Sequence, residues 1–270
     1  MCASLLLFAI LSAVAIAAQT PSLPGATEER GAFALPDPTG ARLLVIPDLA
    51  RPESLKTALC SGGRQFPIRF VRRQTASRDF AGRETPRHFD ELAGSLFKVL
   101  VGRITADATC FLASESFLAE STPLTIAPWH GADACSRAQR GRFASLRGRP
   151  VVHCWPIARL TAQQKIALVE FRHRGKNALA SLVLMDADRT IFADYTAEFR
   201  GEGEDLWRAD DGGVLSPQGF EVICAIQRPN GFVLGVAWAG AEGQSLALWT
   251  SDSNGSFTQV ISDYWYQAPV

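Results

Sequence analysis

Two residues suited to covalent catalysis stand side by side in the chain, His153 and Cys154. A cysteine nucleophile needs a base within hydrogen-bonding distance, and that base is normally distant in the sequence. Residues 151–157 have the composition of a β-strand, in which neighbouring side chains point to opposite faces. His153 therefore cannot easily serve Cys154 as a base, and a disulfide at Cys154 would exclude catalysis there.

Other catalytic signatures are absent from the sequence. It contains no Gly-x-Ser-x-Gly elbow, no P-loop and no His-Glu-x-x-His motif. Glu170 and Glu221 lie on or beside expected strands, and the two acids of a glycoside hydrolase are paired in space rather than in sequence. We expect a protein without a catalytic centre, and the alternative is a secreted hydrolase whose catalytic residues are scattered along the chain.

Two acidic turns could bind calcium. Asp186 and Asp188 carry oxygen side chains two residues apart, and Asp252 and Asn254 do the same in a later turn. Calcium prefers several hard oxygen ligands, but neither turn has the later acidic ligand of an EF-hand. Asp and Asn also favour hairpin turns for backbone reasons alone. A weak calcium site is one hypothesis for these residues, and a purely structural role is the other.

Aromatic side chains are concentrated after residue 200. Sugar-binding sites on β-scaffolds use exposed aromatic faces, which makes a carbohydrate ligand a second hypothesis. Trp238, however, alternates with Leu234 and Val236, and this pattern favours packing in the core. The aromatic residues in question are Trp207, Trp238, Trp249, Tyr264, Trp265 and Tyr266.

The amino-terminal segment predicts export. Residues 5–18 are apolar, and residues 15–17 form a small-x-small cleavage site before a polar, proline-rich stretch. A helix that spans a bilayer needs about 20 residues, so this segment is short for a span. We expect a signal peptide at residues 1–17 and a periplasmic or secreted protein with no transmembrane span after cleavage. An uncleaved anchor is the alternative, and the excess of Arg over Lys indicates a bacterial source.

Export would place the cysteines in an oxidising compartment, where disulfides form. Five of the six cysteines lie beyond the signal segment. The shortest loop joins Cys135 to Cys154, and Cys60 with Cys110 is the next natural pair. Cys224, in an apolar run, is then left as a small buried hydrophobic residue. These pairings are hypotheses, because spacing does not determine connectivity.

Charge is balanced overall but not along the chain. The 27 basic and 27 acidic residues leave no net positive field, which disfavours a nucleic-acid partner. Lys and Arg are in excess in residues 1–149, mainly at 64–87 and 137–149, whereas acids are concentrated at 186–211. An arginine-rich face could contact an anionic or carbohydrate component of the cell envelope, and a solvated surface is the alternative.

The first half of the chain predicts short, mixed elements. Residues 18–40 have the composition of a flexible leader, and residues 41–149 that of an α+β region. Pro52 begins a segment that ends before Gly62, which predicts a helix over 52–59. We further expect a helix from residue 85, an edge strand at 66–70 because of Pro67, a hairpin of 97–104 with 108–114, and a helix over 132–146.

Residues 150–270 predict antiparallel β-sheet. Apolar segments recur about every ten residues and are separated by turn formers such as Asn230-Gly231. Residues 182–192 also resemble residues 246–257, which suggests a duplicated four-stranded meander packed as a sandwich or as propeller-like blades. The eight expected strands are 151–157, 166–172, 178–185, 190–197, 220–226, 232–238, 245–250 and 257–264.

These features predict an α+β protein with a mixed first half and an antiparallel β second half. Apolar residues make up 47% of the chain and charged residues 20%, which argues against intrinsic disorder. The combination of export, a β-scaffold and missing catalytic motifs favours an exported binding or interaction protein that is not an enzyme.

Overall fold

The computed structural model describes residues 31–268, apart from 47, 79, 81, 130–133, 187–188, 199–206, 208–214 and 252–254. The expected signal peptide, residues 1–17, therefore lies outside the described residues. The described part of the chain is mostly β, with 56% of its residues in strands, and its sheets are antiparallel. No helix in the described part of the chain is long and apolar enough to span a bilayer.

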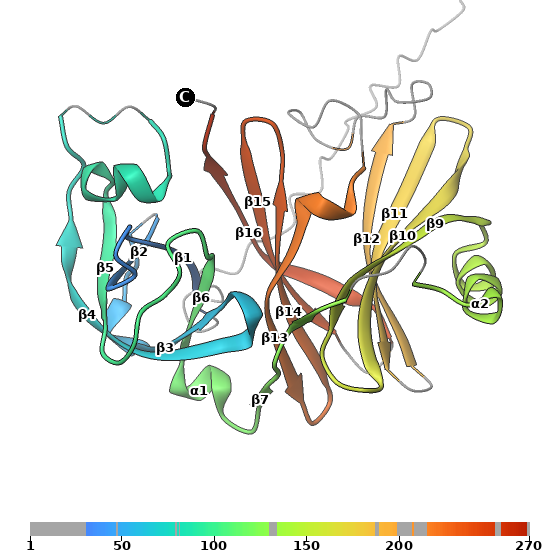
Figure 1. The fold of residues 1–270 in the computed structure, drawn as a ribbon, viewed down its shortest axis with the longest axis horizontal. Coiled ribbons are helices and arrows are strands. Elements are labelled where there is room, and N and C mark those ends of the chain that lie inside the picture. The colour runs from blue at the N-terminus through green and yellow to red at the C-terminus, as the bar shows by residue number, and fades with distance from the viewer. Residues whose placement is uncertain are drawn as a thin grey trace, which may run out of the picture.

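The first unit is a closed six-stranded barrel (Figure 1). Alternate side chains such as Leu43, Phe97 and Leu112 fill its interior. Cys60 and Cys110 are cross-strand partners, and their disulfide joins two barrel strands. The strand order around the barrel is β1 (Ala32–Pro36), β2 (Arg42–Val45), β5 (Gly94–Val99), β4 (Arg64–Gln74), β3 (Leu55–Cys60) and β6 (Cys110–Ser114).

Several expectations for this half are wrong. Residues 32–36, expected to belong to a flexible leader, form strand β1 of the barrel, and residues 18–30 of that leader lie outside the described residues. The predicted helix at 52–59 is a single 3-10 turn, η1 (Pro52–Ser54), followed by β3, since Leu55, Ala58 and Cys60 are needed in the barrel interior. The helix expected from residue 85 is likewise a 3-10 segment, η3 (Pro86–Glu91).

The predicted strand pairings of this half are also wrong. β5 and β6 do not form a hairpin with each other, since β5 pairs with β2 and β4, whereas β6 pairs with β1 and β3. β4 is not an edge strand, because it lies between β3 and β5 with Pro67 opposite Thr57. A closed barrel leaves none of its strands at an edge.

The second half contains all eight expected strands in two antiparallel sheets of the same strand order. We call the sheet with β9 the first sheet and the sheet with β13 the second sheet. The first sheet is β12 (Arg189–Glu198), β11 (Asn177–Asp186), β10 (Gln164–Arg174), β9 (Val151–Arg159) and β8 (Ala127–Pro128). The second is β16 (Phe257–Tyr266), β15 (Gly243–Ser251), β14 (Gly231–Ala239), β13 (Phe220–Arg228) and β7 (Thr122–Pro123).

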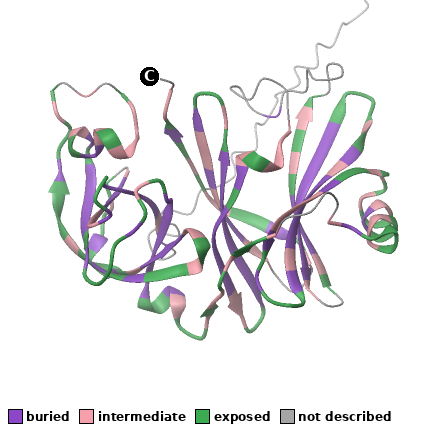
Figure 2. Ribbon diagram, viewed as in Figure 1, coloured by how far each residue is buried: buried purple, intermediate pink, exposed green. Residues whose placement is uncertain are grey.

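The two sheets face each other and share one hydrophobic core, to which Leu182 of the first sheet and Trp238 of the second both contribute (Figures 1 and 2). The other face of the first sheet is covered by α2 (Arg137–Arg147), which corresponds to the helix expected at 132–146 and buries Phe143 there. The other face of the second sheet packs against the barrel through residues such as Leu248. Apart from α1 (Glu115–Leu118) and α2, the described helices are 3-10 turns, so the α+β class is confirmed only in part.

One segment connects the sheets at their first strands. Residues 122–129 pair with β13 through β7, and then with β9 through β8. We call this stretch the crossing segment. On the opposite side a bridge between Phe192 and Ser256 joins β12 to the start of β16. The two sheets are thus linked along both sides, and the crossing segment ends at Trp129, beside the groove described next.

Candidate functional site

A groove of about 340 Å³ lies between the two sheets, along β9. One wall comes from the first sheet and the crossing segment, and the other from η4 (Pro217–Gly219), which precedes β13. The lining is mostly apolar, with a single amide side chain, and this is the usual make-up of a ligand site. The lining residues are Trp129, Trp155, Pro156, Ile157, Pro217, Gln218 and Phe220.

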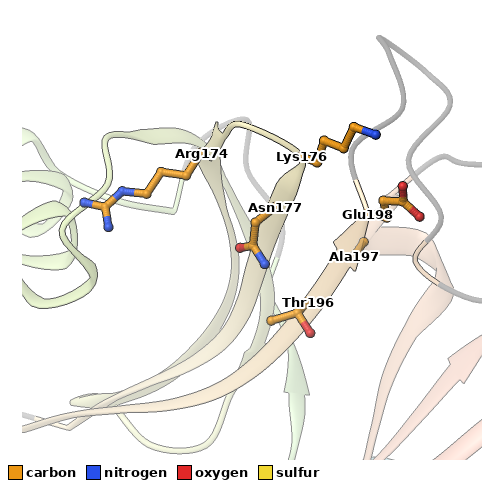
Figure 3. A pocket seen from close by; sticks show the side chains of 6 residues that line it. All are labelled: Arg174, Lys176, Asn177, Thr196, Ala197 and Glu198. Carbon is orange, nitrogen blue, oxygen red and sulfur yellow. The ribbon is translucent and has the colours of Figure 1, made fainter. Parts of the chain in front are cut away.

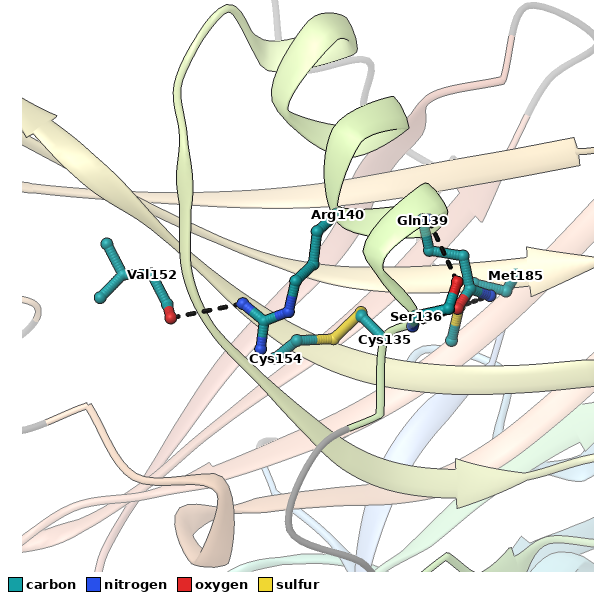
Figure 4. The surroundings of a disulfide bond; sticks show 7 residues. All are labelled: Cys135, Ser136, Gln139, Arg140, Val152, Cys154 and Met185. Carbon is teal, nitrogen blue, oxygen red and sulfur yellow. Dashed lines mark hydrogen bonds between the residues drawn. A yellow bond between two sulfur atoms is a disulfide. The ribbon is translucent and has the colours of Figure 1, made fainter.

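A disulfide fixes the strand that forms the groove. Cys154 lies on the face of β9 that is turned towards α2, where it is bonded to Cys135 (Figure 4). Because side chains alternate along a strand, His153 and Trp155 point to the other face. His153 is therefore separated from Cys154, and the disulfide removes that thiol from any nucleophilic role.

The ring of Trp155 is held between the core and a histidine. His153 stacks on Trp155 with ring centroids 4.9 Å apart and planes 18° from parallel. The imidazole of His153 is in turn held by Glu170, whose Oε2 lies 2.8 Å from Nδ1 of His153. His153 and Glu170 are cross-strand partners on β9 and β10, so their proximity follows from the strand register. An indole fixed in this way loses little conformational entropy when a ligand stacks on it.

The second tryptophan of the groove is positioned by the crossing segment. Ala127 and Pro128 pair with Arg159 and Ala158 of β9, which brings the following residue, Trp129, to the edge of the sheet. The ammonium group of Lys165 lies 5.2 Å from the centroid of the Trp129 ring, at cation–π distance. Trp129 is half-buried against the cluster under α2.

The backbone edge of β9 is closed to an added strand. The carbonyl of Val152 accepts a hydrogen bond from Nη1 of Arg140 (Figure 4), and the carbonyl of Cys154 accepts one from the amide of Ala134. Pro156 has no N–H to offer. A ligand in the groove must therefore be recognised by side chains and not by strand addition.

The aromatic residues singled out in the sequence are not the ones that line this groove. Trp207, Trp238, Trp249 and Trp265 are buried in cores. Tyr264 and Tyr266 of β16 remain exposed, by 42% and 40%. The relevant pair, Trp129 and Trp155, carries no sequence signal beyond the His153-Cys154-Trp155 run, because the pairing of β8 with β9 brings the two rings to one edge.

The two carboxylates considered for glycoside hydrolysis lie apart. Glu170 is on the first sheet, beside His153. On β13, Phe220 and Val222 point into the core between the sheets, so Glu221 points to the opposite face, towards the barrel. There it interacts with Ser61, and partial burial raises its pKa. The second sheet separates the two acids, and they cannot flank one glycosidic bond.

The calcium hypothesis involves four residues, of which the structure describes one. The carboxylate of Asp186 accepts hydrogen bonds from Nε2 of Gln164, at 3.2 Å, and from Nη2 of Arg189, at 2.8 Å. Asp188, Asp252 and Asn254 lie outside the described residues. Within the described residues, no group of three His, Cys, Asp or Glu side chains is placed to hold a metal ion.

A second depression, of about 600 Å³, lies at the end of the β10–β11 hairpin. Figure 3 shows the long side chains of Arg174 and Lys176 pointing away from each other. Arg174 donates a hydrogen bond to the carbonyl of Gly148, and Oδ1 of Asn177 accepts a hydrogen bond from Arg149. Because these groups diverge or are already paired within the protein, the depression is a weaker candidate than the groove.

The cysteines agree with the pairing expected from the sequence. The disulfides are Cys60–Cys110 and Cys135–Cys154, and Cys224 is a free, buried thiol whose pKa is raised to about 12 by burial. A thiol in this environment stays protonated and unreactive at neutral pH. No protein-family model, curated protein or solved structure matches this chain.

Proposed function

We propose that this is an exported binding protein that holds a carbohydrate chain in the groove between its sheets. The observation that carries the proposal is the pair of half-buried tryptophans, Trp129 and Trp155, in one groove of about 340 Å³. The flat C–H face of a pyranose matches an indole ring in shape and polarity, and aromatic rings supply a large apolar contact.

The polar groups of the groove support a hydroxyl-bearing ligand. The amide of Gln218 is exposed at one wall, where its nitrogen can donate to a ligand, while its Oε1 already accepts a hydrogen bond from Oγ of Ser216 at 2.5 Å. The His153–Glu170 pair supplies further polar atoms beside the Trp155 ring. An extended peptide would need main-chain partners, which the closed edge of β9 withholds.

One structural feature supports export, in addition to the expected signal peptide. Disulfides persist in oxidising compartments and are rare in the cytosol, and this chain forms two. A bacterial cell envelope or its exterior is also where carbohydrate polymers are abundant. We propose the periplasm or the extracellular space as the location of the protein.

Titration of the purified protein with chitohexaose and with maltohexaose, followed by calorimetry, tests the function. We expect one of these glycans to bind, and we expect Trp155→Ala and Trp129→Ala each to weaken binding by about tenfold or more, equal to about 1.4 kcal/mol. Tyr266→Ala, an exposed aromatic residue outside the groove, is the matched control and should leave the affinity unchanged. Binding that survives both tryptophan substitutions, or no binding of either glycan, would overturn the proposal.

One observation favours hydrolysis as the second candidate function. His153 is an exposed base whose ring is held 2.8 Å from a carboxylate at the groove, and such a base can activate water. Under this alternative the wild-type protein releases new reducing ends from the bound glycan, and His153→Gln abolishes the release. Because His153 also stacks on Trp155, the affinity of this variant for the glycan is measured separately by calorimetry. If the glycan is still intact after prolonged incubation with the wild-type protein, hydrolysis is excluded and binding without hydrolysis is supported.

A further inference from the structure

The outer surface of the barrel at β4 and β5 lies at one end of the molecule, away from the two sheets (Figure 1). Figure 2 shows exposed residues along this side of β4. In the strand register Arg69 of β4 lies opposite Lys98 of β5, and Lys98 lies opposite Arg42 of β2. Like charges directly across a strand pair repel each other, so this row costs stability unless opposite charges compensate it.

Within the described residues, one cation of the row is compensated by acids of the protein. Arg42 forms ion pairs with Asp37, at 2.9 Å, and with Asp90, at 2.8 Å. Among the residues that the structure places, neither Arg69 nor Lys98 has an ion-pair partner. Two adjacent positive charges are thus presented to the surroundings on the outside of the barrel.

Exposed apolar side chains lie directly beside these charges. Leu100 and Val101 follow β5 and are exposed by 49% and 68%. The amide of Leu100 donates to the carbonyl of Pro67 at 2.9 Å, which places Leu100 next to an exposed proline two residues from Arg69. Arg103 adds a further exposed cation to the same turn. We call Pro67, Arg69, Lys98, Leu100, Val101 and Arg103 the barrel patch.

We propose that the barrel patch docks on the surface of an anionic lipid bilayer. The cations would contact the phosphates of the headgroups, while Leu100 and Val101 would enter the boundary between headgroups and acyl chains. Aliphatic side chains gain burial in a bilayer but find no comparable apolar partner on a phosphorylated polysaccharide, which makes a membrane the better match for this mixture. The groove lies beyond the second sheet from the barrel patch, so a membrane-bound protein could still hold a glycan.

Sedimentation with lipid vesicles tests the proposal. We expect the full chain to bind vesicles of equal parts phosphatidylglycerol and phosphatidylcholine, and not vesicles of phosphatidylcholine alone. Arg69→Glu should reduce the bound fraction at least fivefold, since about 1 kcal/mol is gained for each cation near an anionic surface. Leu100→Ser with Val101→Ser should also weaken binding. Arg137→Glu, on the exposed surface of α2, is the matched charge control and should bind like the wild type.

A thermal melt separates loss of docking from loss of folding. Arg69→Glu places opposite charges across from each other at Lys98, so its melting temperature should equal or exceed that of the wild type. No binding to phosphatidylglycerol vesicles, equal binding by Arg69→Glu, or binding to dextran sulfate in preference to vesicles would each overturn the inference. None of these results bears on the carbohydrate groove, whose own test uses soluble glycans.

Discussion

Gly235 and Cys224 are cross-strand partners in the second sheet, and the structure predicts that their substitutions are strongly coupled. A methyl group on Gly235 would lie 2.6 Å from Sγ of Cys224, far inside contact distance. Both residues are buried, so neither can move aside freely. We expect Gly235→Ala to lower the free energy of unfolding by about 1–3 kcal/mol, the usual cost of an overpacked core.

Removal of the sulfur should relieve this cost. In Gly235→Ala combined with Cys224→Ala, the next atoms near the new methyl are the Cys224 backbone nitrogen at 3.6 Å and Leu248 Cδ1 at 3.7 Å, both ordinary contacts. Cys224→Ala alone should cost about 1 kcal/mol for the lost buried atom. The double variant should therefore be about as stable as Cys224→Ala, with a coupling energy of about 1–3 kcal/mol.

Urea unfolding followed by far-UV circular dichroism, with both disulfides intact, measures all four proteins of this cycle. The reasoning is refuted if the two single substitutions add within about 0.5 kcal/mol, because independent sites behave in that way. A Gly235→Ala protein as stable as the wild type would likewise show that the close approach of Gly235 to Cys224 is not a constraint on the fold.

Two further predictions concern the disulfide under the groove and a half-buried acid. Replacing Cys135 and Cys154 together by Ala should lower the unfolding free energy by about 3 kcal/mol in urea titrations, because the bond closes a loop with a sequence separation of 19; an unchanged midpoint would contradict this. Burial, with a smaller effect of the Asp263 charge, raises the pKa of Glu84. The stability contributed by this group is therefore present at low pH and lost as pH rises through its folded pKa. Glu84→Gln should raise the melting temperature at pH 7 and make no difference near pH 3, and an equal gain at both would exclude the electrostatic cause.

The β-meanders could be predicted because their information is local. Each strand pairs with its neighbour in sequence, and turn residues such as Asn230 and Gly231 fix where one strand ends and the next begins. The resemblance between residues 182–192 and 246–257 corresponds to equivalent hairpins, β11–β12 and β15–β16. Hairpins of this kind can therefore be predicted from a single sequence.

The barrel could not be predicted by the same route, because its strands pair over long distances. β1 closes against β6, which lies 76 to 80 residues further along the chain, through partners such as Phe33 and Phe111. Pro52 does begin a helical turn, but tertiary packing of Leu55 and Ala58 overrides any propensity of the residues that follow. Residues such as Pro52 indicate where an element begins, whereas the pairing of each barrel strand is determined by closure of the whole barrel.

The groove shows the same division between local and distant information. That His153 and Trp155 share a face, opposite Cys154, follows from the strand period alone. The stacking of His153 on Trp155 depends on the register of β9 with β10, which places Glu170 opposite His153. The position of Trp129 in the groove depends on the pairing of the crossing segment with β9. A list of aromatic residues near the carboxyl end could not identify this pair, since most members of that list are core residues.

Proline explains why the groove is open at this place between the sheets. Each short strand of the crossing segment ends at a proline, β7 at Pro123 and β8 at Pro128. The ladder register with β13 and with β9 covers two residues in each case, although the amide of Leu124 still donates to the carbonyl of Ala225 on β13. Pro128, at the end of β8, has no N–H to donate to a ladder. The edge of β9 beyond Ala158 is therefore left without a neighbouring strand, and Trp129, the residue after Pro128, lies beside it. Pro128 thus lies at the end of the pairing between the crossing segment and β9, and the groove lies beside that end.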